Sequence, residues 1–331
     1  MGAIQAQDYN SVRWAVALRI RGEPTEADIE QSIADGSIIR THALRGTWQI
    51  IAPPDVRWML SLVAPRVKQS RARRHQQLEL DAPTFGKSCT VLVKAIEQNG
   101  AMTRDELARA LQRAGISTAG QRLPHILGSA ELEGLLCGGP RRGKQFTWRL
   151  LDTPSPRWSQ EEALAELVGR FFQSRGPATL DDFCWWSGLR VSDARLGIES
   201  GKSSLEMERI GGRDHWRRRK ARRATPRPRA LLLPDFDEWL VGYRNRDAVV
   251  DPKHRGRVNA GGGIIGMCVA LDGNVVGSWR RTLGRRGVAV EVELFQKVSE
   301  QDVTAIERAV ERYAAFVERE PAATVVRVRK K

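Results

Sequence analysis

A short pattern, Gly-x-x-Thr-x-x-acid, occurs three times along the chain. The copies begin at Gly22, Gly100 and Gly176, so they are 78 and then 76 residues apart. Glycine can end a helix in the left-handed conformation, and threonine can cap the next helix by accepting a hydrogen bond from a free backbone amide. The acid three residues later can bond back to the capping residue. A helix–turn–helix repeated at this spacing predicts three copies of one small module.

The size and charge of the chain narrow its class. A chain of 331 residues should form two to four compact units. Its formal net charge of +15 predicts a polyanionic partner, and nucleic acid is the usual one. The sequence contains neither an apolar run long enough to cross a membrane nor a signal-peptide pattern, so we expect a cytoplasmic, nucleoid-associated protein. The four cysteines are scattered without Cys-x-x-Cys or His-Glu-x-x-His spacing, and we expect no metal and no cofactor.

The middle copy predicts a complete module. Helices are expected over 88–98, from Thr103 to about 115, and over 118–133, with Leu92, Ile96, Leu107 and Leu111 on their inner faces. Strands at 135–137 and 145–150 flank a basic turn at 138–143. Three helices followed by a hairpin is the order of a winged helix-turn-helix, which binds DNA through a helix in the major groove and a wing on the backbone.

The other two copies follow the same order. In the third, helices are expected over 161–175, 181–186 and 193–199, the last capped by Ser192. Residues 205–210 and the segment after Gly211-Gly212 should form a wing. Leu164, Leu167, Val168 and Phe171 should face inward, and Trp185 and Trp186 should lie in the core. In the first, helices over 11–21 and 26–34 precede a hairpin of 38–44 and 46–51 and a helix capped by Asp55.

Beyond residue 226 the hydrophobic period changes to two. Strands are expected over 230–233, 275–280, 288–294 and 324–328, with a helix over 301–317. Asp272-Gly273 is a typical hairpin turn. The last part of the chain is therefore predicted to be a β-rich, barrel-like domain of α+β class.

Five segments carry a resemblance to a known family. They are Ile4 to Gln7, Arg40 to Thr47, Asp182 to Leu189, Leu233 to Arg244, and Val250 to Arg255. In this order they resemble the winged-helix family that includes the bacterial DNA glycosylases for bulky alkyl adducts and interstrand crosslinks, the AlkZ/YcaQ-like family. The resemblance implies three tandem winged helices (1–80, 84–153 and 158–224) followed by a β-rich domain (226–331). It agrees with the repeat described above.

The resemblance also implies a catalytic motif. Family glycosylases carry Gln-x-Gln or Gln-x-Asp in the first winged domain, and here it matches Gln5 and Gln7. The motif begins so early that either the true start of the protein lies further upstream or the first domain is N-terminally truncated, and we adopt the second interpretation. The family's Arg-Gly-Thr is commonly followed by an apolar residue and histidine, whereas this chain has Trp48 and Gln49.

The chemistry of the motif can be argued from its side chains. An N7- or N3-alkylated purine is a cationic leaving group, so its excision needs a positioned water and stabilisation of the sugar cation. A glutamine amide can orient that water, and two amides at spacing two face one side of an extended segment. Asp8 is an alternative water-activating group. No lysine nucleophile is indicated, so β-lyase activity is not expected. On its own, Gln-Ala-Gln is usually a solvated stretch of helix or loop.

Basic clusters predict the surface that binds double-stranded DNA. The densest run lies between 213 and 229, and it is either a solvated linker or a wing and tether on phosphates. From this run we predict DNA contacts by His215, Arg217, Arg218, Arg219, Lys220, Arg222 and Arg223. Further contacts are predicted for Arg45, Arg141, Arg142, Lys144, His254 and Arg255. The 214–216 and 253–255 segments are both candidates for the minor-groove hairpin that family members use.

Two functions from different classes remain open at this point. The first is a monomeric, cofactor-free and monofunctional DNA glycosylase that excises bulky or crosslinking alkylated purines. The second is a non-catalytic, regulatory DNA-binding protein that uses the same winged helices. RNA binding is disfavoured because the chain lacks an aromatic RNA-binding strand motif.

Overall fold

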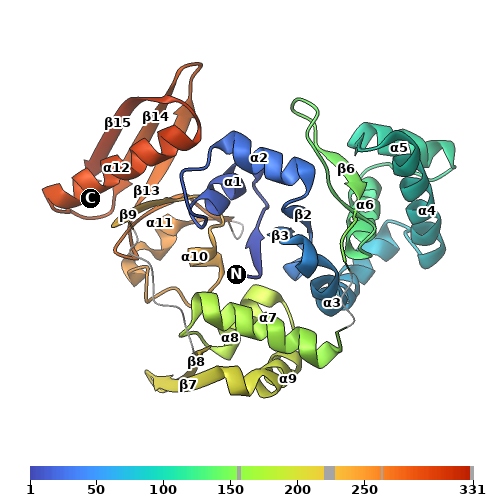
Figure 1. Cartoon of the computed structure of the whole chain (residues 1–331), viewed down its shortest axis with the longest axis horizontal. Coiled ribbons are helices and arrows are strands. Elements are labelled where there is room, and N and C mark those ends of the chain that lie inside the picture. Colours follow the sequence, from blue (N-terminus) through green and yellow to red (C-terminus); the bar gives the residue numbers. More distant parts are fainter. Residues whose placement is uncertain (155–157, 220–227, 262–263, 329–331) are drawn as a thin grey trace. The chain divides into compact units, whose positions relative to one another are not determined.

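The computed structural model describes residues 1–154, 158–219, 228–261 and 264–328 (Figure 1). The chain divides into two compact units. The first unit holds Met1–Ala3 and Glu30–Arg219, and the second holds Ile4–Ile29 and Lys220–Lys331. The second unit therefore combines a stretch near the start of the chain with its C-terminal part. Both units mix helices and strands, so the fold is α+β.

The first unit is built from helices and short antiparallel strand pairs. Its elements are β2 (Ile39–His42), β3 (Trp48–Ile51), α3 (Val56–Gln77), α4 (Ala82–Asn99), β4 (Met102–Thr103), α5 (Arg104–Arg113), α6 (Arg122–Leu132), β5 (Leu136–Gly138), β6 (Thr147–Leu150), α7 (Gln160–Arg175), α8 (Leu180–Ser187), α9 (Val191–Gly201), β7 (Leu205–Ile210) and β8 (Arg213–Arg218). The helix α2 (Glu26–Asp35) contains the boundary between the units.

The threonine of the repeated pattern caps a helix in all three copies, as predicted. Thr25, Thr103 and Thr179 each accept a hydrogen bond from the amide three residues later, and the acid there accepts one from the threonine amide. The prediction for the glycine holds only in part. Gly100 has a positive φ of 71° at the end of α4, as predicted. The prediction is wrong for Gly176, which has a φ of −71° at the end of α7. The cap of α7 is therefore not left-handed.

The middle group of elements has its own apolar core, with the inner-face residues as predicted. Leu92, Leu107 and Leu111 are fully buried where α4, α5 and α6 meet the sheet of strand order β4-β6-β5. The helix expected over 118–133 begins only at Arg122, so Pro124 lies in its first turn, where proline needs no amide hydrogen.

Glu131 lies at the centre of a polar network in this core. Its side chain is completely buried, and it accepts hydrogen bonds from the His42 amide (3.0 Å) and the Trp148 indole (2.5 Å). The His42 ring Nδ1 lies 2.5 Å from the same carboxylate. These contacts tie β2 and β6 to α6.

The third group also packs as predicted, with two corrections. Leu164, Leu167, Val168 and Phe171 of α7 are buried. Trp186 is buried too, but Trp185 is 47% exposed, because the two neighbours point in different directions from the short helix α8. Ser192 does not cap α9, which starts at Val191, two residues earlier than predicted, with Arg190 in the cap position.

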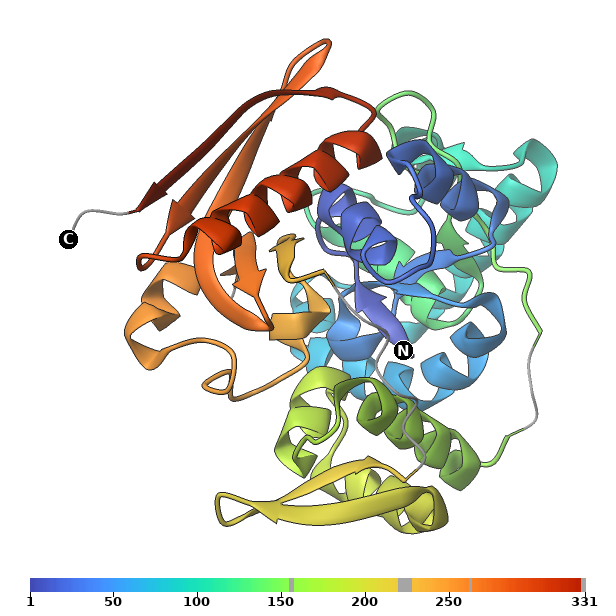
Figure 2. The same ribbon diagram turned by 60° about the vertical axis from the view of Figure 1, so that its left-hand side comes forward.

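The second unit is built around a curled sheet. The strand β1 (Ala3–Gln5) contains the boundary between the units, after Ala3. The other elements of the second unit are α1 (Tyr9–Ala17), β9 (Ala230–Leu233), α10 (Glu238–Val241), α11 (Arg255–Val258), β10 (Asn259–Gly261), β11 (Ile264–Ile265), β12 (Cys268–Leu271), β13 (Asn274–Leu283), β14 (Gly287–Leu294), α12 (Glu300–Phe316) and β15 (Glu320–Val328). Among the described residues, five strands pair in the order β15-β14-β13-β12-β9, and α12 lies across one face (Figure 2).

The predicted period of two is confirmed in this sheet. Along β14, buried residues alternate with less buried ones from Gly287 to Leu294. Asp272 and Gly273 both have positive φ (47° and 89°) between β12 and β13, which is the conformation of the predicted two-residue hairpin turn.

Helix α1 packs on the same sheet. The Trp14 indole donates a hydrogen bond to the Leu232 carbonyl of β9 (2.6 Å), and its ring contacts Tyr313 and Phe316 of α12. This buried aromatic cluster explains why residues 4–29 belong to the second unit, a pairing that the sequence did not predict.

We expect the Glu131 network to contribute strongly to the stability of the first unit. Glu131→Ala would leave the Trp148 indole and the His42 amide without their acceptor, at a cost of about 3 kcal/mol in the free energy of unfolding. Urea titration followed by tryptophan fluorescence measures this. The control is Glu133→Ala, which removes an exposed ion pair with Lys68 and should cost less than about 1 kcal/mol. Equal losses in the two variants would contradict the assigned role.

Candidate active site and nucleic-acid interface

The predicted catalytic segment lies between β1 and α1, within the second unit. Gln5 is the last residue of β1 and is 8% exposed, whereas Gln7 is exposed in the bend that follows. Ala6 between them is fully buried and anchors the segment. The expectation that both amides face the same side requires an extended segment. Because β1 ends at Gln5, the strand does not continue to Gln7, and the two side chains differ in exposure.

Asp8 begins the helix that follows. It is the N-cap of α1, and its Oδ1 accepts a hydrogen bond from the Ser11 amide at 2.6 Å. This is an ordinary capping contact, and it fixes the helix start directly after Gln7.

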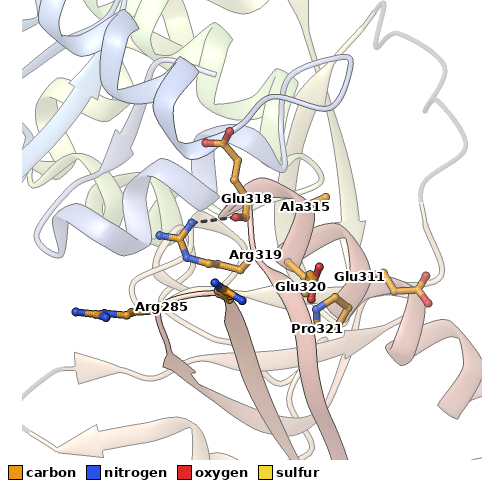
Figure 3. Close-up of a pocket in the computed structure, with 9 residues that line it drawn as sticks. Arg285, Glu311, Ala315, Glu318, Arg319, Glu320 and Pro321 are labelled. Carbon is orange, nitrogen blue, oxygen red and sulfur yellow. Dashed lines mark hydrogen bonds between the residues drawn. The ribbon is translucent and has the colours of Figure 1, made fainter.

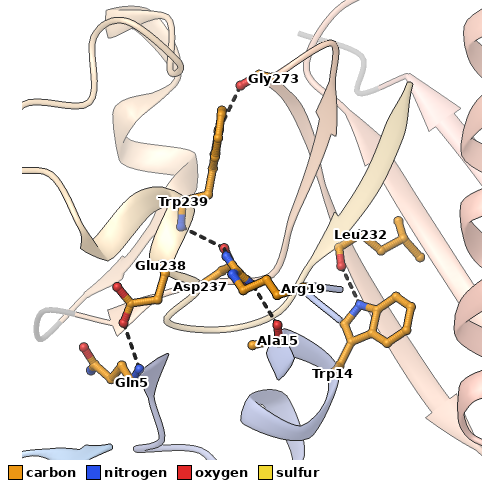
Figure 4. A network of polar contacts seen from close by, with 9 residues as sticks. All are labelled: Gln5, Trp14, Ala15, Arg19, Leu232, Asp237, Glu238, Trp239 and Gly273. Atoms are coloured by element: carbon orange, nitrogen blue, oxygen red, sulfur yellow. Dashed lines mark hydrogen bonds and ion pairs between the residues drawn. The ribbon is translucent and has the colours of Figure 1, made fainter. Parts of the chain in front are cut away.

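The stretch after β9 holds this segment through three carboxylates: Asp235 and Asp237 lie in the loop, and Glu238 is the first residue of α10. Glu238 accepts a hydrogen bond from the Gln5 amide (2.8 Å), and Asp237 accepts two from the Arg19 guanidinium (2.6 and 2.8 Å), as Figure 4 shows. Asp235 accepts one from the Ser11 hydroxyl (3.2 Å). Each carboxylate therefore contacts a different point of the 5–19 segment.

Two of these carboxylates are buried, so the loss of their hydrogen bonds would be costly in free energy. Asp237 is fully buried and Glu238 is 2% exposed. An unpaired charge at such positions would be costly, and the two-pronged contact with Arg19 supplies Asp237 with a cation of matching geometry. Asp237 also caps α10 by accepting from the Trp239 amide (2.8 Å).

Sequence reasoning used this loop only as a marker of resemblance and missed its structural role. A signal was present, because three acids in four residues follow an apolar strand with no basic residue among them. Acids placed there need donors from elsewhere in the chain.

Arg45 lies in the turn between β2 and β3, with a positive φ of 56°. Its guanidinium donates to the Trp186 carbonyl at the C-terminal end of α8. Arg66 of α3 donates to the Gly188 carbonyl just beyond (2.5 Å), and both arginines line a hollow of about 390 Å³. Arg45 thus has a structural role as a helix C-terminal partner, besides any contact with DNA.

The basic turn between β5 and β6 contains three predicted DNA contacts. Arg142 forms an ion pair with Glu106 (2.7 Å), and Arg141 donates to the Lys144 carbonyl (2.8 Å). The Lys144 ammonium is exposed and has no ion pair within the described residues. Lys144 is therefore the most available cation of this turn.

The β7–β8 hairpin contains the described part of the densest basic run. Arg217 is paired with Glu206 (2.6 Å), and Arg219 donates to the Leu205 carbonyl (3.0 Å). The His215 ring contacts the Arg213 carbonyl (3.0 Å), and Arg218 has no ion pair among the residues that the structure describes. The remaining predicted contacts, Lys220, Arg222 and Arg223, lie outside the described residues.

The second hairpin candidate lies in the second unit. His254 is only 6% exposed and its ring packs 5.0 Å from that of Phe295, with neither nitrogen hydrogen-bonded in the described part of the chain. Burial lowers the pKa of His254, and the nearby Lys253 and Arg257 lower it further. Arg255 is exposed and forms an ion pair with Asp247.

A further basic cluster lies around the β13–β14 turn. A hollow of about 720 Å³ lies there, between the turn and the end of α12. Figure 3 shows the side chains that line it. Its charged lining residues are Arg285, Arg286, Arg319, Glu311, Glu318 and Glu320. The hollow has as many arginines as glutamates in its lining. Its charge therefore favours the binding of neither a phosphate group nor a cation.

The described residues contain neither a metal-binding cluster nor a membrane-spanning helix. Within 1–154, 158–219, 228–261 and 264–328, no group of three or more His, Cys, Asp and Glu residues could hold a metal ion. Burial raises the pKa of Cys137 to about 11 and that of Cys268 to about 12, so these thiols are poor nucleophiles. In the same described ranges, no helix is both long and apolar enough to cross a membrane.

Comparisons with known proteins agree with this architecture. A family model described as DNA glycosylase AlkZ-like matches residues 1–316. An interstrand DNA cross-link repair glycosylase from Streptomyces sahachiroi is 29% identical over 299 residues, which are 83% of this chain and 79% of that protein. The solved structure of the DNA glycosylase AlkZ from Streptomyces sahachiroi has a similar fold, with a TM-score of 0.75 at 24% identity over 99% of this chain and 91% of that chain. The chain therefore belongs to the AlkZ-like DNA glycosylase family, and the resemblance is confirmed.

Lys144 offers a test of the proposed nucleic-acid interface. If its ammonium contacts a phosphate, Lys144→Ala should reduce the salt dependence of duplex binding by about 0.9 in the slope of log K against log salt concentration. Fluorescence anisotropy across a sodium chloride series measures that slope. Lys202→Ala is the matched control, because Lys202 is paired with Glu199. Identical slopes in the two variants would place Lys144 outside the interface.

Proposed function

From its membership of the AlkZ-like family, we propose that this protein is a monofunctional DNA glycosylase that excises bulky or crosslinking alkylated purines. The proposal is supported by the relative that is described as an interstrand cross-link repair glycosylase. It is also supported by the net charge of +15, which suits a duplex DNA substrate. The product would be an abasic site, and the protein would act as a monomer without a cofactor.

The reaction requires little from the protein. Alkylation at N7 or N3 places a positive charge on the purine, so the C1′–N bond can break with its electrons going to a base that leaves as a neutral molecule. A water oxygen then bonds to C1′ and releases its proton to solvent. The protein must orient that water and stabilise the cationic sugar.

Gln7 and Gln5 would divide this work. The exposed amide of Gln7 is available to orient a water molecule, with its carbonyl accepting and its NH₂ group donating. Gln5 is buried and held by Glu238 through its backbone, which fixes the start of the segment. Asp8 remains the alternative water-activating group, because one of its oxygens is used in capping α1 and the other is not needed for that contact.

The domain organisation belongs to the same proposal. We interpret 1–80, 84–153 and 158–224 as three tandem winged helices and 226–331 as a β-rich C-terminal domain. The order of helices followed by a basic hairpin, in α4–α5–α6 with β5–β6 and in α7–α8–α9 with β7–β8, supports this interpretation. The β5–β6 turn that carries Lys144 and the β7–β8 hairpin, in which Arg218 lies at the end of β8, would then lie on the DNA backbone.

The observation that carries the proposal is the full-length family match together with an exposed glutamine in the motif. Gln7→Ala should lower the single-turnover excision rate about 100-fold, because an attacking water loses its orientation. The assay uses duplex DNA with one N7-alkylguanine, followed by alkali and separation of the cleaved strand. DNA affinity should change little.

Gln98→Ala is the control, since Gln98 is an exposed amide on α4. It should excise at the rate of the unaltered protein. Absence of lesion-dependent cleavage by the unaltered protein, together with intact duplex binding, would favour the non-catalytic DNA-binding function instead. Equal loss of affinity and rate in Gln7→Ala would make Gln7 a structural residue.

A further inference from the structure

Two carboxylates meet at Ser11, directly after the glutamine motif. The Ser11 amide donates to Asp8 Oδ1 at 2.6 Å, and the Ser11 hydroxyl donates to Asp235 Oδ2 at 3.2 Å. Ser11 itself is 1% exposed, so this bridge is shielded from solvent. Asp235 is thereby linked to the residue that follows Gln7, although 224 positions separate it from Ser11 in the chain.

The surroundings of Asp235 disfavour its ionised form. Burial raises the pKa of Asp235, and the neighbouring Asp8 carboxylate raises it further. The Ser11 hydrogen bond, the Arg281 guanidinium of β13 and the Met267 backbone act in the opposite direction without cancelling the shift. The Cys268 thiol of β12 also lies near this carboxylate.

A purely structural acceptor for Ser11 would not require a charge. A group whose folded-state pKa is raised binds its proton more tightly in the folded protein, so stability falls as pH rises through that range. At neutral pH the ionised Asp235 therefore opposes folding, and an asparagine could accept the same hydrogen bond without that cost. Charges that reduce stability in this way are concentrated at functional sites.

We propose that Asp235 is a positioning residue of the glycosylase site, which acts on Asp8, and through it on the adjacent Gln7, by way of the Ser11 hydroxyl. This inference rests on the proposed function. Ionised Asp235 holds Ser11 and adds negative charge beside Asp8, which favours a cationic sugar over the uncharged ground state of the sugar. Protonation of Asp235 removes that charge, so excision should slow as the pH falls through its raised pKa.

The test compares excision of N7-methylguanine from duplex DNA under single-turnover conditions, from about pH 4, the ordinary range of an aspartate carboxyl, up to about pH 8. Asp235→Asn should lower the rate at pH 7.5 about tenfold or more and remove the decline at acidic pH. Its DNA affinity and melting temperature should not decrease. Asp235→Glu restores the charge and should recover part of the rate together with the acidic decline.

Two further variants complete the comparison. Asp272→Asn is the matched control, because Asp272 lies in the β12–β13 turn and pairs with Arg229. It should keep both the rate and the pH profile. Ser11→Ala leaves both carboxylates in place and removes the bridge, so the rate should fall and the midpoint of the acidic decline should move.

Several results would overturn the inference. An Asp235→Asn protein with an unaltered rate and pH profile would do so. A rate loss that only parallels a lower melting temperature would make Asp235 structural. If Asp235→Asn does not fold, an unaltered pH profile in Ser11→Ala decides against the proposal. If the wild type is active and Gln7→Ala inactivates it but Asp235→Asn does not, only this inference is refuted. If the wild type is inactive, the proposed function itself is refuted.

Discussion

The glutamine segment depends on hydrogen bonds from the N-terminal stretch to carboxylates of one loop. Glu238 holds the Gln5 amide, Asp237 holds Arg19, and Asp235 holds Ser11. These contacts place a segment from the start of the chain on the sheet formed by its C-terminal part. Because two of the acids are buried, the segment cannot leave without exposing uncompensated charges to an apolar interior. The loop therefore fixes where the motif lies and which side chains it exposes.

Many of the basic side chains form contacts within the protein and are not available to bind DNA. A net charge of +15 describes the whole chain, yet many arginines are used inside the protein. Arg19 neutralises a buried acid, Arg45 caps a helix end, and Arg142 and Arg217 pair with glutamates. Cations without such partners, of which Lys144 is an example, remain free to bind phosphates at less cost. The surface that attracts phosphates is accordingly set by the cations without an acidic partner, and not by the total number of arginines.

Local features were predictable from the sequence, and long-range ones were not. The three threonine caps, the inner faces of α4 and α7, and the Asp272 hairpin turn follow from signals within a few residues. The positive φ expected at Gly176 and the burial expected for Trp185 were wrong, because tertiary packing decides both. The grouping of residues 4–29 with the C-terminal sheet, and the role of the acidic loop, depend on contacts more than 200 residues apart.

Hydrogen exchange at the Gln5 backbone amide tests the central claim most directly, namely that the loop holds the glutamine segment in place. In the intact protein this amide donates to a buried carboxylate, so its exchange should be slow. Glu238→Ala should bring its exchange close to that of an unstructured peptide, with a parallel loss of excision. Rapid exchange in the intact protein, or slow exchange that persists in Glu238→Ala, would contradict the account.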